Sequence, residues 1–282
     1  MHYVSVCAIF RNEATYLEEW LDFHVAQGIG HFYLYDNMST DNPAQVLNNY
    51  KKRGLVTQIT CEIPYNKGAQ RSSYTHCLKH FGHTSRWIAF IDLDEFLFSP
   101  QGKLSDKLVR YETHPGVVVH WQCYGSAGHQ QTPPGAVTAN FLYRAPTDWV
   151  RNLRVKSIVN PSRTVGPSSP HFFDYQDDML AVNEQHQEVS VVSGDAKSRP
   201  KTPDEVDISV DPFARKRIKN LNVSANLFRI NHYSIKSRDE YLAKRAKQPD
   251  GDRKYDDHFF AYHDRNEIYD PILKDTLVNI RS

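Results

Sequence analysis

The sequence predicts an α/β fold with a mostly parallel central sheet flanked by helices. Apolar, strand-like runs alternate with helical patterns through the first hundred residues, and the connections between them are short. The run from Trp87 to Ile91 is apolar throughout, which is typical of an interior strand buried on both faces. Together these observations predict a doubly wound first half, followed by a less regular, elaborated second half within a single domain spanning 1–282.

Each element of the first half has its own signal. Strands are expected at 3–10, 31–35 and 55–61, with a fourth that begins near residue 86. Helices are expected between them, and capping and breaking residues mark their ends. These signals are a capping box of Thr15 and Glu18 with Gly28 as the stop, Asn42 as cap and Pro43 at the first helical position with Gly54 after the end, and a third helical pattern over 69–81.

The second half alternates less clearly. Strands are expected at 117–123, 139–143, 155–159 and 227–230, and Ser237 with Glu240 forms a capping box that opens a basic helix to about residue 247. Residues 183–219 are polar and charged without an apolar period, which predicts a mobile loop. This loop is either a lid beside the active site or a surface insertion without function.

Composition narrows the class of protein. Lys and Arg number 34 and Asp and Glu 33, so no overall positive field favours nucleic acid as a partner. The four cysteines lie in apolar stretches without CxxC spacing, which favours buried thiols and a reducing compartment. No run of about eighteen apolar residues is present, and a strand that starts near residue 3 leaves no room for a signal peptide. We expect a cytoplasmic protein, although an anchor would be missing if the chain is an excised catalytic domain.

Three carboxylates follow the apolar run that begins at Trp87. Asp92 and Asp94 alternate along the chain, so both are expected on one side, where they repel each other unless a divalent cation or a proton separates them. Oxygen ligands suit Mg²⁺ or Mn²⁺, and such an ion suits a phosphate-bearing substrate. The alternative is an acidic turn that ends the strand.

A series of motifs resembles those of a known family. The stretches are 4–13 (VSVCAIFRNE), 35–41 (YDNMSTD), 66–71 (NKGAQR) and 92–94 (DLD), followed by 121–126 (WQCYGS), 155–161 (VKSIVNP), 171–172 (HF) and 231–237 (NHYSIKS). Their order resembles that of GT-A nucleotide-sugar glycosyltransferases, and more narrowly the glycosyltransferase 92 and family-2-like group. The resemblance implies a nucleotide-binding half at 1–100 ending in the DxD motif, an acceptor-side half at 101–247 and a C-terminal extension at 248–282.

The resemblance implies roles for residues that contact the nucleotide. Asp36 matches the carboxylate that accepts the uracil N3 proton, with an Asx turn to Ser39 as its alternative. The remaining candidates for the nucleoside and the phosphates are Asn12, Glu13, Lys67, Arg71, Asp92 and Lys236. Glu13 has an alternative role beside the next helix N-terminus, and Lys67 has one as a solvated side chain. The basic helix at 237–247 is a candidate for peripheral contact with an anionic membrane or an acidic glycolipid.

The metal and the catalytic base follow from the same resemblance. Asp94 is the first choice of ligand for Mn²⁺ or Mg²⁺, Asp92 contacts the ion, its water or the ribose, and His232 completes the shell. An inverting transfer needs a base near the acceptor hydroxyl, and four residues qualify without ranking: Glu95, Asp148, His171 and Asp174. Trp121 is the preferred platform for a sugar ring.

The leading interpretation is a metal-dependent transferase that moves a hexose, with galactose as the first to try, from a UDP-sugar to a glycan or glycolipid acceptor. A haloacid-dehalogenase-like phosphatase with Asp92 as nucleophile is one alternative, but Phe96 stands where that family needs Thr or Val. A non-catalytic carbohydrate-binding module is the other. Nucleic acid is not expected, because three acids at a strand end repel phosphates without a metal.

Overall fold

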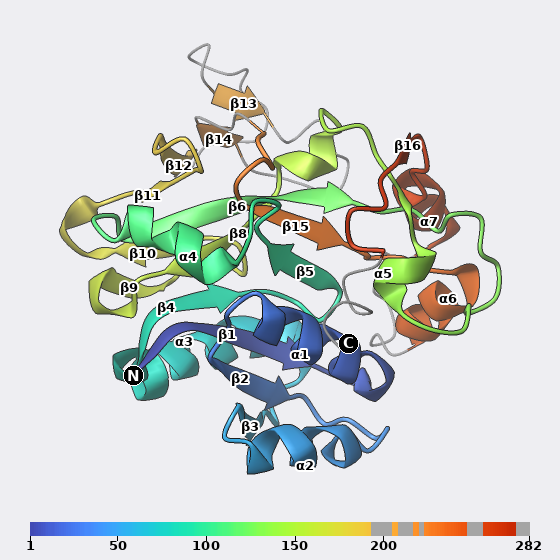
Figure 1. Ribbon diagram of the computed structural model, residues 1–282, viewed down its shortest axis with the longest axis horizontal. Coiled ribbons are helices and arrows are strands. Elements are labelled where there is room, and N and C mark those ends of the chain that lie inside the picture. Colours follow the sequence, from blue (N-terminus) through green and yellow to red (C-terminus); the bar gives the residue numbers. More distant parts are fainter. Residues whose placement is uncertain (193–204, 208–216, 220–222, 247–255, 275–282) are drawn as a thin grey trace.

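A computed structural model describes residues 1–192, 205–207, 217–219, 223–246 and 256–274 of the chain (Figure 1). In its first half, strands β1 (His2–Phe10), β2 (His31–Asp36), β3 (Val56–Thr60) and β4 (Ser85–Phe90) are parallel in the order β3-β2-β1-β4. Helices α1 (Ala14–Ala26), α2 (Ala44–Lys52) and α3 (Ala69–Phe81) connect them. The predicted alternation of strand and helix is confirmed.

For two helices, the residue predicted to cap the N-terminus does not cap it. Helix α1 begins at Ala14, and its first backbone N–H donates to Asp41 Oδ2 at 2.7 Å, so the cap comes from the loop after β2 rather than from Thr15. The side chain of Asn42 does not cap α2, because Asn42 itself takes a positive φ of 55° and Pro43 occupies the cap position. Both stops are confirmed, since Gly28 (φ 88°) and Gly54 (φ 72°) adopt the left-handed backbone that ends a helix.

The second half joins the sheet with mixed directions. Strand β8 (Val155–Val159) is antiparallel to both β4 and β6 (Gly116–Cys123), so β4 has one parallel and one antiparallel neighbour. Strand β15 (Arg229–His232) runs parallel to β6 and antiparallel to β5 (Glu95–Phe98). The fold class is therefore as predicted, a mostly parallel α/β sheet, with antiparallel strands inserted where the chain passes from one half to the other.

Three expectations for the second half need correction. The strand predicted at 139–143 is instead the short helix α5 (Val137–Asn140) followed by β7 (Tyr143–Arg144), because the Glu19 carboxylate accepts the N–H groups of Val137 and Thr138 and holds the first turn. Strand β15 starts two residues later than the run at 227–230. Part of the loop predicted at 183–219 is sheet, namely β12 (Glu188–Val192), β13 (Glu205–Asp207) and β14 (Arg217–Lys219). Residues 183–187 form the turn that leads into β12, with Asn183 buried, and 193–204 and 208–216 lie outside the described residues.

The remaining elements surround these strands. Helix α6 (Arg238–Ala246) opens with the predicted capping box, in which Ser237 Oγ and Glu240 Oε2 are 2.5 Å apart. Helix α7 (Asp257–His263) follows, and both lie on the side toward which β6 and β15 point in Figure 1. The other strands and helices are α4 (Leu104–Leu108), β9 (Thr164–Pro167), β10 (Phe173–Tyr175), β11 (Ala181–Val182) and β16 (Ile268–Tyr269). Short 3₁₀ turns are η1 (Tyr65–Lys67), η2 (Gly82–Thr84), η3 (Val109–Tyr111), η4 (Val150–Leu153), η5 (Pro161–Arg163) and η6 (Gln176–Asp178).

The core lies on both faces of the sheet, with β4 in the middle. Trp87 and Ala89 pack into one apolar cluster, while Ile88 and Phe90 pack into the other. This confirms that the apolar run is buried on both faces. All four cysteines are buried and free, as predicted. Within the residues that the structure describes, no helix is both long and apolar enough to cross a bilayer.

Candidate functional site

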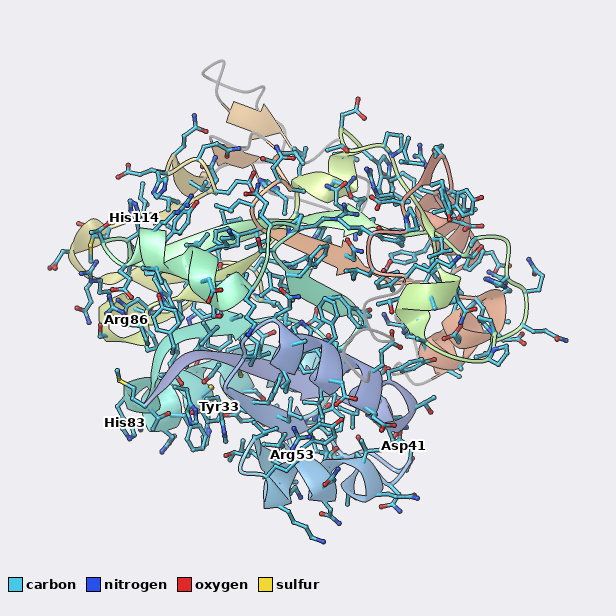
Figure 2. The ribbon with its side chains drawn as sticks, viewed as in Figure 1. Tyr33, Asp41, Arg53, His83, Arg86 and His114 are labelled. Carbon is cyan, nitrogen blue, oxygen red and sulfur yellow. The ribbon has the colours of Figure 1, made fainter. Side chains whose placement is uncertain are left out.

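The parallel strands place their carboxyl ends along one edge of the sheet. Figure 2 shows Arg86, at the beginning of β4, and Asp41, in the loop after β2, on opposite sides of the molecule. A cavity of about 300 Å³ lies at the carboxyl ends of β1 and β4. The side chains that line it and bear on its chemistry are Arg11, Glu13, Gln70, Asp92, Asp94, Trp121, Arg151, Arg154, Lys156, His171, His232 and Lys244.

Asp92 is held by polar side chains from α3 and from β8. Its Oδ1 accepts a hydrogen bond from Gln70 Nε2 at 2.6 Å, and its Oδ2 lies 2.8 Å from Lys156 Nζ. Lys156 is almost fully enclosed, with 1% of its side chain exposed. Burial disfavours its charged form, but Asp92 and Glu95 outweigh burial and raise the pKa of Lys156. Lys156 therefore stays protonated and fixes the position of Asp92.

Glu95 lies behind the two aspartates rather than in the cavity wall. Its side chain is fully buried, and Oε2 accepts the backbone N–H of Asp92 at 2.8 Å. Burial raises the pKa of Glu95 well above its ordinary range, despite Lys156 at 3.7 Å. Its Oε1 has no hydrogen-bond partner among the described residues. Glu95 thus supports the turn that carries Asp92, and it does not face the space where an acceptor would bind.

Asp94 has a different set of partners, which come from the late part of the chain. Its Oδ2 lies 2.6 Å from Lys244 Nζ on α6, and its Oδ1 lies 3.6 Å from His232 Nε2 at the end of β15. Burial opposes ionisation, but Lys244 and His232 hold the pKa of Asp94 well below its ordinary range. Burial lowers the pKa of His232, so its imidazole is neutral near pH 7. Each aspartate therefore has its own basic partner: Lys156 pairs with Asp92, and Lys244 pairs with Asp94.

The predicted metal ligands fit a divalent ion in part. Asp94 and His232 face each other and offer an anionic oxygen and a neutral nitrogen, which are donors that Mn²⁺ accepts. Asp92 lines the same cavity but is bonded to Gln70 and Lys156. Within the described residues no cluster of three or more His, Cys, Asp or Glu side chains has the geometry of a metal site. The pair of Asp94 and His232 is thus the part of the predicted ligand set that the structure brings together.

The four base candidates are separated by the structure. Asp148 is exposed and Asp174 lines a second cavity on β10, so neither faces the aspartates. Glu95 is behind them. His171 lines the cavity, and its Nδ1 lies 2.9 Å from the Val155 carbonyl oxygen, which makes Nδ1 the protonated nitrogen and leaves Nε2 as an acceptor. Burial and the nearby Lys156 lower the pKa of His171 well below its ordinary range, so the imidazole is neutral.

The residues predicted for the nucleoside are mostly outside this cavity. Glu13 lines it, but Asp36 does not. Asp36 Oδ1 accepts the Ser39 N–H at 2.9 Å, which is the Asx turn considered as its alternative, and Oδ2 accepts from Gln58 at 3.1 Å. Asn12 also joins the two loops, because its Oδ1 accepts the Thr40 N–H at 2.6 Å. Asp36 and Asn12 thus shape the edge beside the cavity, and their predicted contacts with a base stay predictions.

The predicted phosphate-binding residues lie farther out. Lys67 and Arg71 are exposed and do not line the cavity. Lys236 is buried with its Nζ 4.1 Å from the centre of the Tyr16 ring, in a cation–π contact, and also lies outside the lining. The basic helix is not a uniformly exposed face, because Lys244 turns toward Asp94 and Arg238 pairs with Asp257 at 2.7 Å.

Six polar residues of the site were not predicted, namely Arg11, Gln70, Arg151, Arg154, Lys156 and Lys244. Gln70 lies on the buried side of α3, four residues before Tyr74, whereas the predicted Arg71 lies on the exposed side, so helical periodicity was a usable signal. Lys156 stands in β8, a strand that is buried throughout, and a lysine in a buried strand is itself a signal of a charged partner. Lys244 gave no such signal, because its position in α6 looks like any basic surface helix.

Comparison with known proteins adds family information to this geometry. The family model named Glycosyltransferase family 92 matches residues 1–193. A glycosyltransferase family 92 protein of Oryza sativa subsp. japonica is 33% identical over 192 residues, which are 64% of this chain and 31% of that protein. One from Ricinus communis is 28% identical over 167 residues, 57% of this chain and 29% of that protein. The matched part therefore spans about a third of the length of these relatives.

Solved structures show more distant likeness. S. aureus TarS 1–349, whose crystal structure is also known in complex with UDP, has a TM-score of 0.39 and 17% identity, covering 57% of this chain and 47% of that one. The mannosyltransferase Ktr4p from S. cerevisiae, solved in complex with GDP, has a TM-score of 0.28 and 11% identity over 45% and 42% of the two chains. The family match covers more than half of the chain and includes Asp92, Asp94 and Lys156, and it displaces the phosphatase alternative. The chain belongs to glycosyltransferase family 92.

Proposed function

We propose that this domain transfers a hexose from a UDP-sugar to a glycan or glycolipid acceptor, with inversion at the anomeric carbon. The observation that carries the proposal is the charge of the cavity wall. Five basic and three acidic side chains line the cavity, and His171 and His232 are neutral. The wall thus carries more positive than negative charge, and Asp92 and Asp94 lie within it. Positive charge suits a bound diphosphate, and the two aspartates suit a cation bound beside it.

Unpaired donors in the wall support a polar ligand. Among the described residues, Arg11 Nε and Trp121 Nε1 are buried without a hydrogen-bond partner, and both residues line the cavity. A buried donor without a partner costs about 1–3 kcal/mol, so a ligand that accepts from it gains that amount on binding. Trp121 lines the cavity but is only 4% exposed, with its ring centroid 4.2 Å from that of His232, so its role as a platform for a sugar ring stays a prediction.

The proposal includes a divalent ion, Mn²⁺ or Mg²⁺. Asp94 and His232 would hold it, with Asp92 beside them. When bound, the ion would neutralise charge on the leaving UDP, which carries one more negative charge than the diphosphate of the UDP-sugar because its β-phosphate keeps the electron pair of the broken C–O bond. Arg151 and Arg154 line the same cavity and would orient the phosphates, while Lys156 adds positive charge from its place beside Asp92. These residues of the chain provide positive charge at the leaving group independently of the metal.

His171 is the base that we assign to the acceptor hydroxyl. It is the one base candidate of the four that lines the cavity, and its tautomer leaves Nε2 able to accept a proton. Its lowered pKa keeps the imidazole neutral at physiological pH, so Nε2 can accept a proton, but it also makes His171 a weaker base. The negative charge of a bound diphosphate beside Lys156 would counter that effect and favour proton uptake during attack.

Two measurements test the proposal. The purified protein is incubated with UDP-galactose and other UDP-sugars, a glycan and glycolipid extract, and Mn²⁺, and UDP release is followed. Asp94→Asn is expected to lower the rate by about 10²–10³, the usual loss when a group that stabilises transition-state charge is removed. Asp148→Asn, an exposed carboxylate outside the cavity, is the matched control and should retain the wild-type rate.

The result that would contradict the proposal is specific. Equal UDP release by wild type and Asp94→Asn, with both proteins folded, would remove Asp94 from the reaction. Calorimetry then distinguishes a carbohydrate-binding module from a transferase. The module would bind sugar without UDP or Mn²⁺, whereas a transferase binds UDP more tightly when Mn²⁺ is present.

A further inference from the structure

The salt bridge between Lys244 and Asp94 lies where the proposed function needs an open carboxylate. Lys244 Nζ is 2.6 Å from Asp94 Oδ2 and 3.0 Å from the Ser234 carbonyl oxygen, and Lys244 lines the cavity. A cation on Asp94 competes directly with a metal ion for the same oxygen. Lys244 lies beyond residues 1–193, which carry the family match.

The two lysines of the site differ in their freedom to move. Lys156 has 1% of its side chain exposed and sits in the central strand β8, where it also lies 3.7 Å from Glu95. Lys244 has 25% exposed and stands in the last turns of α6. Helix α6 packs through Tyr241 in a small apolar cluster with Ile235 and Phe259, separate from the two clusters of the sheet. Lys244 is therefore the lysine that can exchange partners at low cost.

The beginning of α6 is fixed, so the exchange needs only the side chain. Glu240 forms the capping box with Ser237, and the Tyr16 hydroxyl donates to Glu240 at 2.6 Å, which ties α6 to α1. A lysine has a four-carbon stem with several rotatable bonds, so its ammonium can reach a new partner in the same cavity while the backbone stays in place. The nearest new anions in the proposed reaction are the phosphates of the donor.

We propose that Lys244 is an exchangeable counter-ion: it neutralises Asp94 in the free protein and moves to the diphosphate when donor and metal bind, leaving Asp94 to the ion. The inference rests on the proposed function, and it makes α6 part of the donor site. Lys244 keeps Asp94 ionised and paired while the cavity is empty, and it adds one positive charge to the leaving group when the cavity is filled. Metal and nucleotide should consequently bind with positive coupling.

Calorimetry with two probes tests this exchange. Binding of Mn²⁺ alone, and of UDP at saturating Mn²⁺, is measured for wild type, Lys244→Met and Lys244→Arg. The Met variant removes the competing charge, so its affinity for Mn²⁺ alone should rise about tenfold, while its affinity for UDP should fall about tenfold with the lost phosphate contact. The Arg variant keeps the charge and should bind Mn²⁺ as weakly as wild type.

The neighbouring residue on α6 provides the matched control. Arg245→Met changes the next residue of α6, whose guanidinium lies 3.6 Å from Asp257 outside the cavity, and both affinities should stay at the wild-type values. An unchanged Mn²⁺ affinity, or an unchanged UDP affinity, in Lys244→Met overturns the exchange, and Lys244→Gln repeats the test should the Met variant fold poorly. Absence of UDP binding by wild type would instead contradict the proposed function, while the Mn²⁺ experiment would still decide whether Lys244 competes with the ion.

Discussion

Asp92 and Asp94 stand two residues apart, yet different regions of the molecule hold them. The partners of Asp92 are Gln70 on α3 and Lys156 on β8, within the residues matched by the family model. The partners of Asp94 are His232 on β15 and Lys244 on α6, which lie beyond that match. The DxD motif therefore joins two regions: α3 and the central strand β8 hold Asp92, and the late segment from β15 to α6 holds Asp94.

The largest expected effect separates the two lysines by stability. Lys156→Met leaves Asp92 and the fully buried Glu95 without their cation, and removing one partner of a buried pair costs about 3 kcal/mol or more. Lys244→Met removes a lysine that is 25% exposed and leaves one carboxylate, Asp94, without its cation, so it should cost about 1–2 kcal/mol, between the values for exposed and buried pairs. Urea unfolding of both variants at pH 7 measures the two free energies. Equal midpoints for the two variants would contradict the contrast between a rigid and an exchangeable counter-ion.

A smaller effect on activity distinguishes neighbouring residues of α3. Gln70→Ala removes the hydrogen bond to Asp92 Oδ1 and lets that carboxylate turn, so UDP release should slow about tenfold, the loss of roughly one good hydrogen bond to a charged group. Arg71→Ala is the matched control, because Arg71 is exposed on the opposite side of the helix. Initial rates with the same UDP-sugar decide the matter. A larger loss for Arg71→Ala than for Gln70→Ala would restore the nucleotide contact predicted from sequence.

The first half of the molecule was largely predictable because its signals are local. The alternation of apolar runs, the bounds of α3 and the burial of β4 on both faces follow from periodicity and from Gly28 and Gly54. The capping residue of α1 was predicted wrongly because the cap, Asp41, is distant from the helix in the sequence. Among the site residues, Asp92, Asp94, His171 and His232 were predicted, and the structure brings them to one cavity.

What sequence could not give was the pairing between distant residues. Asp94 and Lys244 are 150 positions apart in the chain, and Asp92 and Lys156 are 64 apart. No local pattern encodes such pairs, because a lysine on a helix has the same sequence signature whether it faces water or a carboxylate. The direction of β8 relative to β4 was likewise invisible, since strand periodicity is the same in parallel and antiparallel neighbours.

The smallest expected effect tests whether the late region is integral to the fold that carries Asp94. Asp270 Oδ2 lies 2.7 Å from Arg229 on β15 and 2.6 Å from Arg144 on β7, so it ties the segment after β16 to the strand that ends in His232. Burial opposes ionisation, but the two arginines hold the pKa of Asp270 below its ordinary value of 3.8. The carboxylate therefore stabilises the fold above the unfolded-state pKa, and that contribution disappears as the pH falls through the lowered folded-state value.

Asp270→Asn should accordingly cost about 1–2 kcal/mol at pH 7, because both guanidinium groups lose a charged acceptor. The difference in unfolding free energy between wild type and variant should shrink as the pH is lowered from about 5 toward 3, since protonation of Asp270 in the wild type removes the same charge. Urea unfolding across this range measures it, with Asp148→Asn, an exposed carboxylate, as the control whose stability should match the wild type throughout. A difference that stays constant with pH would mean that Asp270 acts by packing rather than by charge, and that the late region holds β15 without the ion pairs seen in the structure.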